Sequence, residues 1–336
     1  MKKHVLITIL FFSVQHIYSQ GCCSGGSSSP IAGGAASGVL LKNQLEIASS
    51  YQFVSTHTFK TNNNRDTISI LDDTLNTNYL FFKTDYGLSD QLSMSIALGY
   101  FLNKTLENKS DSYTASGICD LILFPRYNIV NWKRENHRTE ITLGLGLKFP
   151  LGSYKDSTLQ FSHPVVGDLY AYNPTAVQLT NGSLDAMFYS FIYRTYPKRK
   201  LRIFANSLYI KKAYNSLGQK FGNYSSFSLY IGKTVYKSLS LTGQLKYEAV
   251  GKTKAAKGVD LILYNIEDHN TGSKKVLFIP QISYSHNDLS YFISADIPLY
   301  EDLNGFQFAT QYQFTAGVSF RIMTKESNLD GIIELN

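Results

Sequence analysis

The sequence is poor in tryptophan, in charged residues and in long apolar runs. Its 336 residues include one Trp and three Cys, and only 17% are Asp, Glu, Lys or Arg. After the N-terminal leader no apolar run reaches the about 18 residues that a membrane-spanning helix needs, which excludes a helical membrane protein. Tyr (24) and Phe (21) are abundant, and both favour strands. The composition therefore favours an all-β chain.

Sequence motifs of common enzymes are also missing. The chain has no HExxH, GxSxG or P-loop pattern, and its histidines beyond the leader fall in expected loops and turns without the partners of a catalytic triad. The formal net charge of +7 would suit nucleic acid, but much of the basic charge sits in short clusters at 131–138 and 196–200. Such clusters are typical of solvated turns. We expect no enzymatic activity, no cofactor and no nucleic-acid partner.

Residues 1–19 have the pattern of a secretory signal peptide. Lys2 and Lys3 precede an apolar run at 5–14, and Ser19 is a small residue at a plausible cleavage point. The mature chain is therefore expected to be exported.

Residues 20–38 form a Gly/Ser-rich stretch that contains Cys22 and Cys23 and is expected in the periplasm. Its composition cannot support a packed core, so a flexible linker is the simplest interpretation. Three alternatives stay open. The stretch could plug a pore, Cys22 and Cys23 could hold a soft metal such as Cu(I) or Zn, or one of them could form a disulfide with a periplasmic protein.

From residue 39 onwards, apolar and polar side chains alternate in a series of segments. A strand points successive side chains to opposite faces, so each such segment would have one apolar and one polar face. The clearest case, 91–102, sets Leu92, Met94, Ile96, Leu98 and Tyr100 against Ser93, Ser95, Ala97 and Gly99. Another, 306–322, is expected to form one long closing strand. At about 17 residues it exceeds the usual 5–6 of a soluble strand and the about 9–11 that cross a bilayer at a tilt.

The connections between about twelve such segments alternate in length. Long connections are expected at 57–75, 103–113, 151–182 and 251–273, short turns lie between them, and 299–305 is a short exception. Short periplasmic turns and longer external loops are typical of outer-membrane barrels. The sequence thus predicts an all-β, antiparallel up-and-down transmembrane barrel of about 12 strands (range 10–14) over 39–322, with a periplasmic tail at 323–336. A soluble β-sandwich is the alternative.

The predicted barrel belongs in the lipid of the outer membrane of a Gram-negative bacterium, with both termini in the periplasm. Several charged or aromatic residues on the polar faces are candidates for lining the lumen or the substrate path: Glu46, Asp120, Phe124, Arg126, Lys148, Lys246 and Glu248. Asp120 and Arg126 are expected partners in a network that either stiffens the barrel or assists passage, and that could include Lys148, Glu46, Lys246 and Glu248. Phe124 could close a narrow lumen, and Cys119 is expected to point outward.

Three segments carry a family resemblance: SGICDLILFPRYNI at 116–129, GLGLKFPLGSYKD at 144–156 and IPLYEDLNGFQF at 297–308. They resemble strands of the MetA-pathway phenol-degradation family of outer-membrane proteins, which is similar to the FadL-like channels for hydrophobic compounds. The resemblance implies an outer-membrane barrel that serves as a transporter. Cys119 departs from the pattern, which has a small Gly before the Asp, and Cys22 and Cys23 lie outside it.

These observations favour a channel that passes a small hydrophobic or aromatic compound through the barrel without direct energy coupling. The alternative is a barrel without a transport role. Such a barrel would bind or adhere through its external loops, or would serve a periplasmic metal or redox system through Cys22 and Cys23.

Overall fold

The computed structural model describes residues 38–65, 73–109, 111–165 and 167–325. The expected signal peptide, nearly all of the Gly/Ser-rich stretch with Cys22 and Cys23, and most of the C-terminal tail lie outside the described residues. Within the described ranges, no helix is long and apolar enough to cross a membrane.

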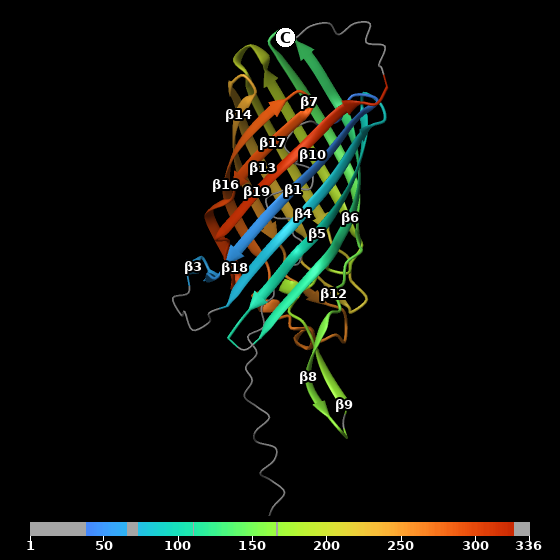
Figure 1. Cartoon of the computed structure of the whole chain (residues 1–336), viewed down its shortest axis with the longest axis vertical. Helices are drawn as coiled ribbons and strands as arrows, with labels where there is room; N and C mark the ends of the chain where they lie inside the picture. The colour runs from blue at the N-terminus through green and yellow to red at the C-terminus, as the bar shows by residue number, and fades with distance from the viewer. Residues whose placement is uncertain (1–37, 66–72, 110, 166, 326–336) are drawn as a thin grey trace, which may run out of the picture.

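A closed antiparallel barrel of twelve strands dominates the described chain (Figure 1), which confirms the predicted fold class. Neighbouring strands in the sequence are neighbours in the ring, so the topology is up-and-down. In chain order the barrel strands are β1 (Gln44–Thr56), β4 (Thr74–Gly87), β5 (Leu92–Glu107), β6 (Ser112–Arg134), β7 (His137–Pro150), β10 (Asp185–Tyr196), β11 (Leu201–Lys211), β13 (Tyr224–Tyr236), β14 (Leu239–Val250), β16 (Ser273–His286), β17 (Leu289–Ala295) and β19 (Tyr312–Met323).

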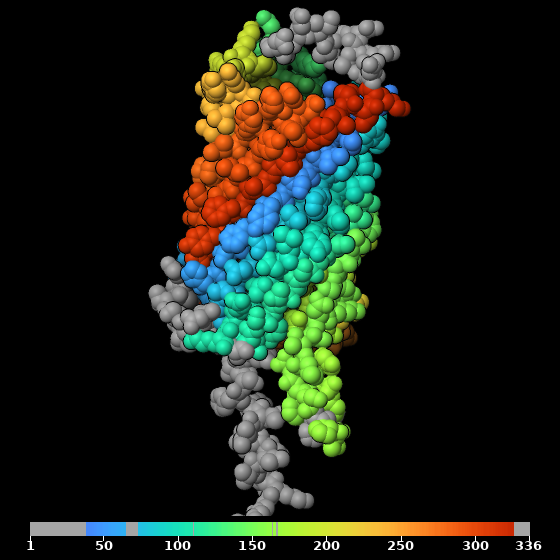
Figure 2. Space-filling model, viewed as in Figure 1, coloured from blue at the N-terminus to red at the C-terminus, as the bar shows by residue number. Residues whose placement is uncertain are grey.

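The ring closes where the first barrel strand meets the last. Strand β1 pairs with β19 along its length, from Gln44 opposite Met323 to Ser55 opposite Tyr312. Figure 2 shows the two ends of the colour scale side by side at this seam. Each barrel strand therefore pairs with a strand on both sides, and a closed sheet without open edges is what a sheet in lipid requires.

The side-chain alternation separates an apolar exterior from a polar interior. On β7 the outward Leu143, Leu145 and Leu147 are 45–61% exposed, whereas the inward Thr142 and Lys148 are 0% and 4% exposed. The dry core of a sandwich would not hold such inward polar groups, because each needs a partner. An exposed apolar belt around a polar interior is instead the arrangement of a membrane barrel.

The first barrel strand begins and the last one ends at the same end of the barrel, the end that carries the short turns. Asn43 donates a backbone hydrogen bond to Gly87, where β4 ends, and accepts one from Thr324, just after β19. The other turns at this end are tight, and one contains the short helix η2 (Pro197–Arg199). We call this the short-turn end and the opposite one the long-loop end.

The C-terminal region differs from the prediction. The expected strand over 306–322 is wrong, because the chain turns between Phe308 and Tyr312. The expected connection at 299–305 is wrong too, since it lies inside strand β18 (Ile297–Phe308), which pairs with β16 and with β2 (Phe59–Asn62). The alternation of apolar and polar residues continues across this turn, although the neighbouring strands change. Phe306 does not face lipid, because its ring stacks on that of Phe59 with 4.6 Å between the centroids.

The long-loop end carries the remaining elements. The expected long loop at 103–113 is much shorter, since β5 and β6 extend to Glu107 and from Ser112. The segment between β7 and β10 contains a hairpin that projects from the barrel (Figures 1 and 2). The elements at this end are β2, β3 (Asn64–Arg65), β8 (Ser157–His163), β9 (Gly167–Tyr172), η1 (Thr175–Val177), β12 (Gln219–Lys220), β15 (Lys254–Ala255), η3 (Leu261–Tyr264) and η4 (Asp268–Asn270).

Candidate functional site

The lumen beside the seam holds a buried ionic cluster, which we call the seam network. Lys83 Nζ lies 2.8 Å from Asp85 Oδ2 and 4.0 Å from Glu46 Oε1. Arg126 Nη2 donates to the other oxygen of Asp85 at 3.0 Å, and Arg321 forms an ion pair with Glu46. Four strands, β1, β4, β6 and β19, are thus tied together inside the barrel.

A second cluster, the arm network, lies on β6, β7 and β10. Lys148 Nζ lies 2.9 Å from Asp120 Oδ2 and 3.4 Å from Asp185 Oδ2, and all three residues are buried. The Thr180 hydroxyl donates to Asp120 Oδ1 at 2.6 Å. The expected pair of Asp120 with Arg126 is wrong. The two lie six residues apart on one strand, about 20 Å at 3.3 Å per residue, and each bonds to neighbouring strands instead.

A third cluster draws residues from five strands, β2, β13, β14, β16 and β18. Lys246 Nζ lies 2.8 Å from Glu248 Oε2, which also accepts a hydrogen bond from the Tyr224 hydroxyl at 3.0 Å. Glu301 lies 3.4 Å from Lys275 and 3.0 Å from Lys60. Each acid in the three networks therefore has a base within 4.0 Å, and the lumen charges compensate one another.

Aromatic rings form a continuous inner surface on β6, β10, β11 and β13, which we call the aromatic column. Its members are Phe124, Tyr189, Phe191, Phe204 and Tyr230. Successive ring centroids are 4.2–6.3 Å apart, within the range of favourable aromatic contacts. The lumen thus offers an apolar surface on these four strands in addition to its ionic groups.

Two glycines of β7 give Phe124 its position. A Cβ built on Gly144 or Gly146 would stand 2.5 or 2.4 Å from the Phe124 ring, closer than real contacts allow. The ring therefore lies over the inner face of β7, in the space that two absent side chains leave. Phe124 therefore lies against the wall of the barrel. This position does not support the expectation that Phe124 closes the lumen.

Cys119 is buried, 1% exposed, and packs with Phe101 and Leu179, so the expected outward orientation is wrong. The reason is a β-bulge. The register between β5 and β6 shifts at this point, with Leu98 opposite Leu121 but Tyr100 opposite Ile118. Two residues, Cys119 and Asp120, then face one on β5, and strict alternation fails.

The long-loop end of the lumen is covered by residues 173–183, which we call the inner arm. Residues 175–181 are buried without a break. Lys104 Nζ of β5 donates to the Gln178 carbonyl at 3.0 Å, and Leu179 packs on Phe101 inside the barrel. The backbone N–H groups of Leu179 and Thr180 donate to the Ser153 carbonyl. Hydrogen bonds and apolar packing therefore both hold the arm in place.

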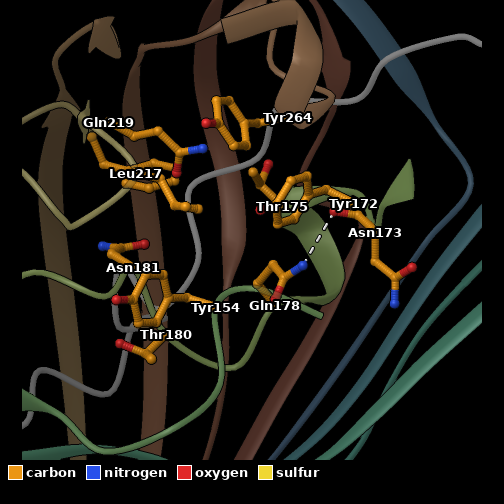
Figure 3. Close-up of a pocket in the computed structure, with 11 residues that line it drawn as sticks. Tyr154, Tyr172, Asn173, Thr175, Gln178, Thr180, Asn181, Leu217, Gln219 and Tyr264 are labelled. Atoms are coloured by element: carbon orange, nitrogen blue, oxygen red, sulfur yellow. Dashed lines mark hydrogen bonds between the residues drawn. The ribbon is translucent and has the colours of Figure 1, made fainter. Parts of the chain in front are cut away.

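A small cavity lies beside the inner arm (Figure 3). Aromatic rings and uncharged amides line it: Tyr154, Tyr172, Tyr264, Phe221, Asn173, Gln178, Asn181 and Gln219. A second cavity adjoins it at Phe221 and reaches Lys212, Glu248 and Lys275 at the end of the third cluster. Phe221 thus lines both cavities.

All seven sequence-derived lumen candidates point into the barrel, and all but Glu248 are classed as buried. Several equally buried partners were missed: Lys83, Asp85, Asp185, Lys104 and Glu301. Charges two residues apart on a predicted strand, as in Lys83 and Asp85, were a usable signal, because both must share one face. Among the described residues no cluster of three or more His, Cys, Asp or Glu could hold a metal; Cys22 and Cys23 lie outside them.

Comparison with known proteins gives a structural match only. No protein-family model matches the chain, and no curated protein does. The COG4313 outer membrane channel from Pseudomonas putida F1 superposes with a TM-score of 0.60 at 14% identity, covering 84% of this chain and 97% of that one. The β domain of the Bordetella autotransporter BrkA follows at a TM-score of 0.46 and 10% identity, covering 84% and 100%. At these identities the likeness shows the fold: this chain is built as a twelve-stranded barrel of the outer-membrane type.

Proposed function

We propose that this protein is an outer-membrane channel that passes a small hydrophobic or aromatic compound without direct energy coupling. The observation that carries the proposal is the aromatic column inside the lumen. A water-filled pore for ions has no use for five contacting rings on its inner wall, whereas an apolar solute gains contact area from them. The compensated charges of the three networks leave little net field to attract ions.

The proposal includes a location and an orientation. The exposed apolar belt would contact the lipid of the outer membrane, and the short-turn end with both strand termini would face the periplasm. The match to an outer-membrane channel supports the barrel type, and the resemblance to the phenol-degradation family supports the class of compound.

Uptake into proteoliposomes tests the proposal. We expect a small aromatic compound to enter vesicles that contain the protein faster than empty vesicles. Phe124→Ala should lower the uptake rate, and Asp120→Ala or Arg126→Ala should alter it. Phe227→Ala is the matched control, because this ring is 53% exposed on the outer face of the barrel. No uptake by the full chain or by a chain lacking residues 21–37 would refute the channel.

A second candidate function is binding through the external face. The β8–β9 hairpin projects from the barrel and exposes Phe161, Leu169 and Tyr170, each at least 56% exposed. Exposed apolar side chains on a projecting hairpin favour contact with another molecule. Replacing residues 158–171 with a Gly-Ser linker distinguishes the candidates: adhesion should disappear and uptake should persist if binding is the role of the hairpin. A periplasmic partner or metal bound through Cys22 and Cys23 remains a separate prediction.

A further inference from the structure

The second of the two cavities at the long-loop end has two bases beside apolar side chains. Lys212 and Lys275 both line it, and Lys212 is only 2% exposed. The Lys212 Nζ lies 5.9 Å from the centroid of the Phe221 ring, within the about 6 Å of a cation–π contact. Phe308 and Leu303 also line the cavity, and both are buried. Ammonium groups and apolar surface therefore meet in one small space.

The acids near this cavity are already engaged. Among the described residues that line it, Glu248 is the only acid, and its Oε2 lies 2.8 Å from Lys246 Nζ and accepts a hydrogen bond from the Tyr224 hydroxyl. Glu301 of the same cluster lies 3.0 Å from Lys60. A cation that entered the cavity would therefore meet two ammonium groups and carboxylates that already have partners, whereas an anion would be attracted by both lysines.

The count of charges agrees with this. The third cluster contains two acids, Glu248 and Glu301, and Asp296 also interacts electrostatically with its Lys246. These three acids balance the three bases of the cluster, which are Lys60, Lys246 and Lys275. Lys212 then adds one positive charge to the described residues at the cavity. Inside a protein such a charge attracts an anion more strongly than it does in water.

The first cavity, drawn in Figure 3, differs in this respect. The residues that line it are aromatic, aliphatic, amide and hydroxyl side chains, and none is charged. Its rings and amides can contact any small aromatic compound, so charged and uncharged compounds are distinguished only in the second cavity. The space between the residues of that second cavity is about 580 Å³ with its open mouth included. A compound with one ring fits within it.

We propose that the second cavity binds an aromatic carboxylate, with the carboxylate at Lys212 and Lys275 and the ring at Phe221 and Phe308. A carboxylate is charged at neutral pH and accepts hydrogen bonds from more than one donor, so it suits a site with two ammonium groups. The inference rests on the proposed function and deepens it, because it narrows the compound from any small aromatic molecule to one that carries an acidic group.

Binding to the full chain in detergent tests the inference. Benzoate and benzamide are close in shape, and only benzoate is charged at neutral pH. Isothermal titration should give a dissociation constant at least about tenfold lower for benzoate, because its hydrogen bonds to the lysines are charge-assisted. This comparison needs no variant. Equal affinities, or no binding of either compound, would overturn the inference.

Substitutions of Lys212 identify the site. Lys212→Met should weaken benzoate binding about tenfold and leave benzamide binding unchanged, whereas Lys212→Arg keeps the charge and should keep the preference for benzoate. Lys257→Met is the matched control, because Lys257 is exposed at the same end of the barrel and does not line the cavity. Heat-modifiable gel migration shows whether each variant folds. A folded Lys212→Met chain that still prefers benzoate would place the site elsewhere and overturn the assignment; if that variant does not fold, loss of the preference in Lys212→Arg would do so.

Acetate tests the aromatic part of the proposal. It lacks a ring for Phe221 and Phe308, so it should bind at least about tenfold more weakly than benzoate. Equal binding of acetate and benzoate would mean a site for simple anions and would overturn the compound class.

Uptake into proteoliposomes separates this inference from the proposed function. If benzoate binds through Lys212 and no aromatic compound enters the vesicles, the binding site stands and the channel is wrong. If benzamide enters the vesicles and the chain shows no preference for benzoate, the channel stands and the carboxylate site is wrong.

Discussion

At the scale of single residues, the lumen depends on buried ions that are paired. Lys148 lies between Asp120 and Asp185, and all three residues are at most 5% exposed. Removing the lysine would leave two buried carboxylates facing each other. Buried pairs contribute little net stability, but breaking one is expensive because an uncompensated charge remains.

We therefore expect Lys148→Met to lower the free energy of unfolding by about 3–5 kcal/mol. Circular dichroism during urea unfolding in detergent measures this change. Lys198→Met is the matched control: Lys198 lies 3.9 Å from Glu135 with both side chains more than 70% exposed, and surface pairs contribute about 0–1 kcal/mol. Equal losses in the two variants would contradict the role given to the arm network.

The fit of Phe124 over β7 leads to a second prediction. Gly146→Ala should displace the ring and lower stability by about 1–3 kcal/mol, the usual effect of overpacking. A smaller side chain should relieve the clash, so Phe124→Leu in the same chain should recover part of the loss. Gly243→Ala serves as the control, because its new methyl would meet Phe278 at an ordinary 3.5 Å. If Gly146→Ala left the free energy of unfolding unchanged, the Phe124 ring and the β7 wall would have room to adjust, contrary to the prediction.

These same side chains show which features of the lumen can be predicted from the sequence. Period-two alternation places Phe124, Arg126 and Lys148 on the inner face, because the pleat alone decides the face. It does not decide the partners. Lys148 meets Asp185 only because β10 lies beside β7 after a connection of more than thirty residues, and no local pattern contains that distance. The bulge at Cys119 was hidden for a similar reason, since it is a property of two paired strands.

At the scale of elements, the inner arm matters most. The sequence marks 151–182 as a long connection rich in turn residues. The structure confirms a connection between two barrel strands, but its exposed part is the β8–β9 hairpin and its last residues return into the barrel, and neither feature was predicted. The return depends on long-range contacts: Thr180 with Asp120, and the Gln178 carbonyl with Lys104. The joined strand predicted over 306–322 failed likewise, because its alternation does not reveal that Phe306 and Phe308 pack on β2.

The anchoring of the arm can be weakened by one isosteric change. Thr180→Val removes the hydroxyl that donates to Asp120, and leaving a buried acceptor unsatisfied costs about 1–3 kcal/mol. The arm should then open more often, and a protease should cut it about tenfold faster than in the native chain. Thr105→Val removes an exposed hydroxyl that bonds Thr114 outside the arm, so cleavage should not change. Unchanged cleavage of Thr180→Val would mean that other contacts hold the arm.

At the scale of the whole molecule, the exposed apolar side chains on the outside of the barrel are expected to contact lipid. Leu145 lies near the middle of β7 and is 61% exposed, whereas Leu159 lies on the projecting β8–β9 hairpin and is 45% exposed. The two side chains are chemically identical. They differ in their expected surroundings, since Leu145 should lie within the bilayer and Leu159 outside it.

Leu145→Arg should therefore destabilise the barrel in lipid vesicles by about 2–4 kcal/mol, the effect of Arg near the bilayer midplane. Leu159→Arg should leave the free energy of unfolding unchanged. Urea titration in vesicles measures both variants. If Leu145→Arg is as harmless as Leu159→Arg, the belt does not lie in the membrane and the barrel assignment needs a soluble explanation.

The seam between β1 and β19 has a consequence for biogenesis. Glu46 and Arg321 are separated by 275 positions, so the contact that closes the ring is among the most non-local in the chain. Contacts of this kind form late, since loop-closure entropy has to be overcome first. Until the last strand is available for pairing, any partly folded chain presents two unpaired edges that invite aggregation. For the outer-membrane location proposed above, this means that the fold is completed only after export and that the two edges need protection on the way to the membrane.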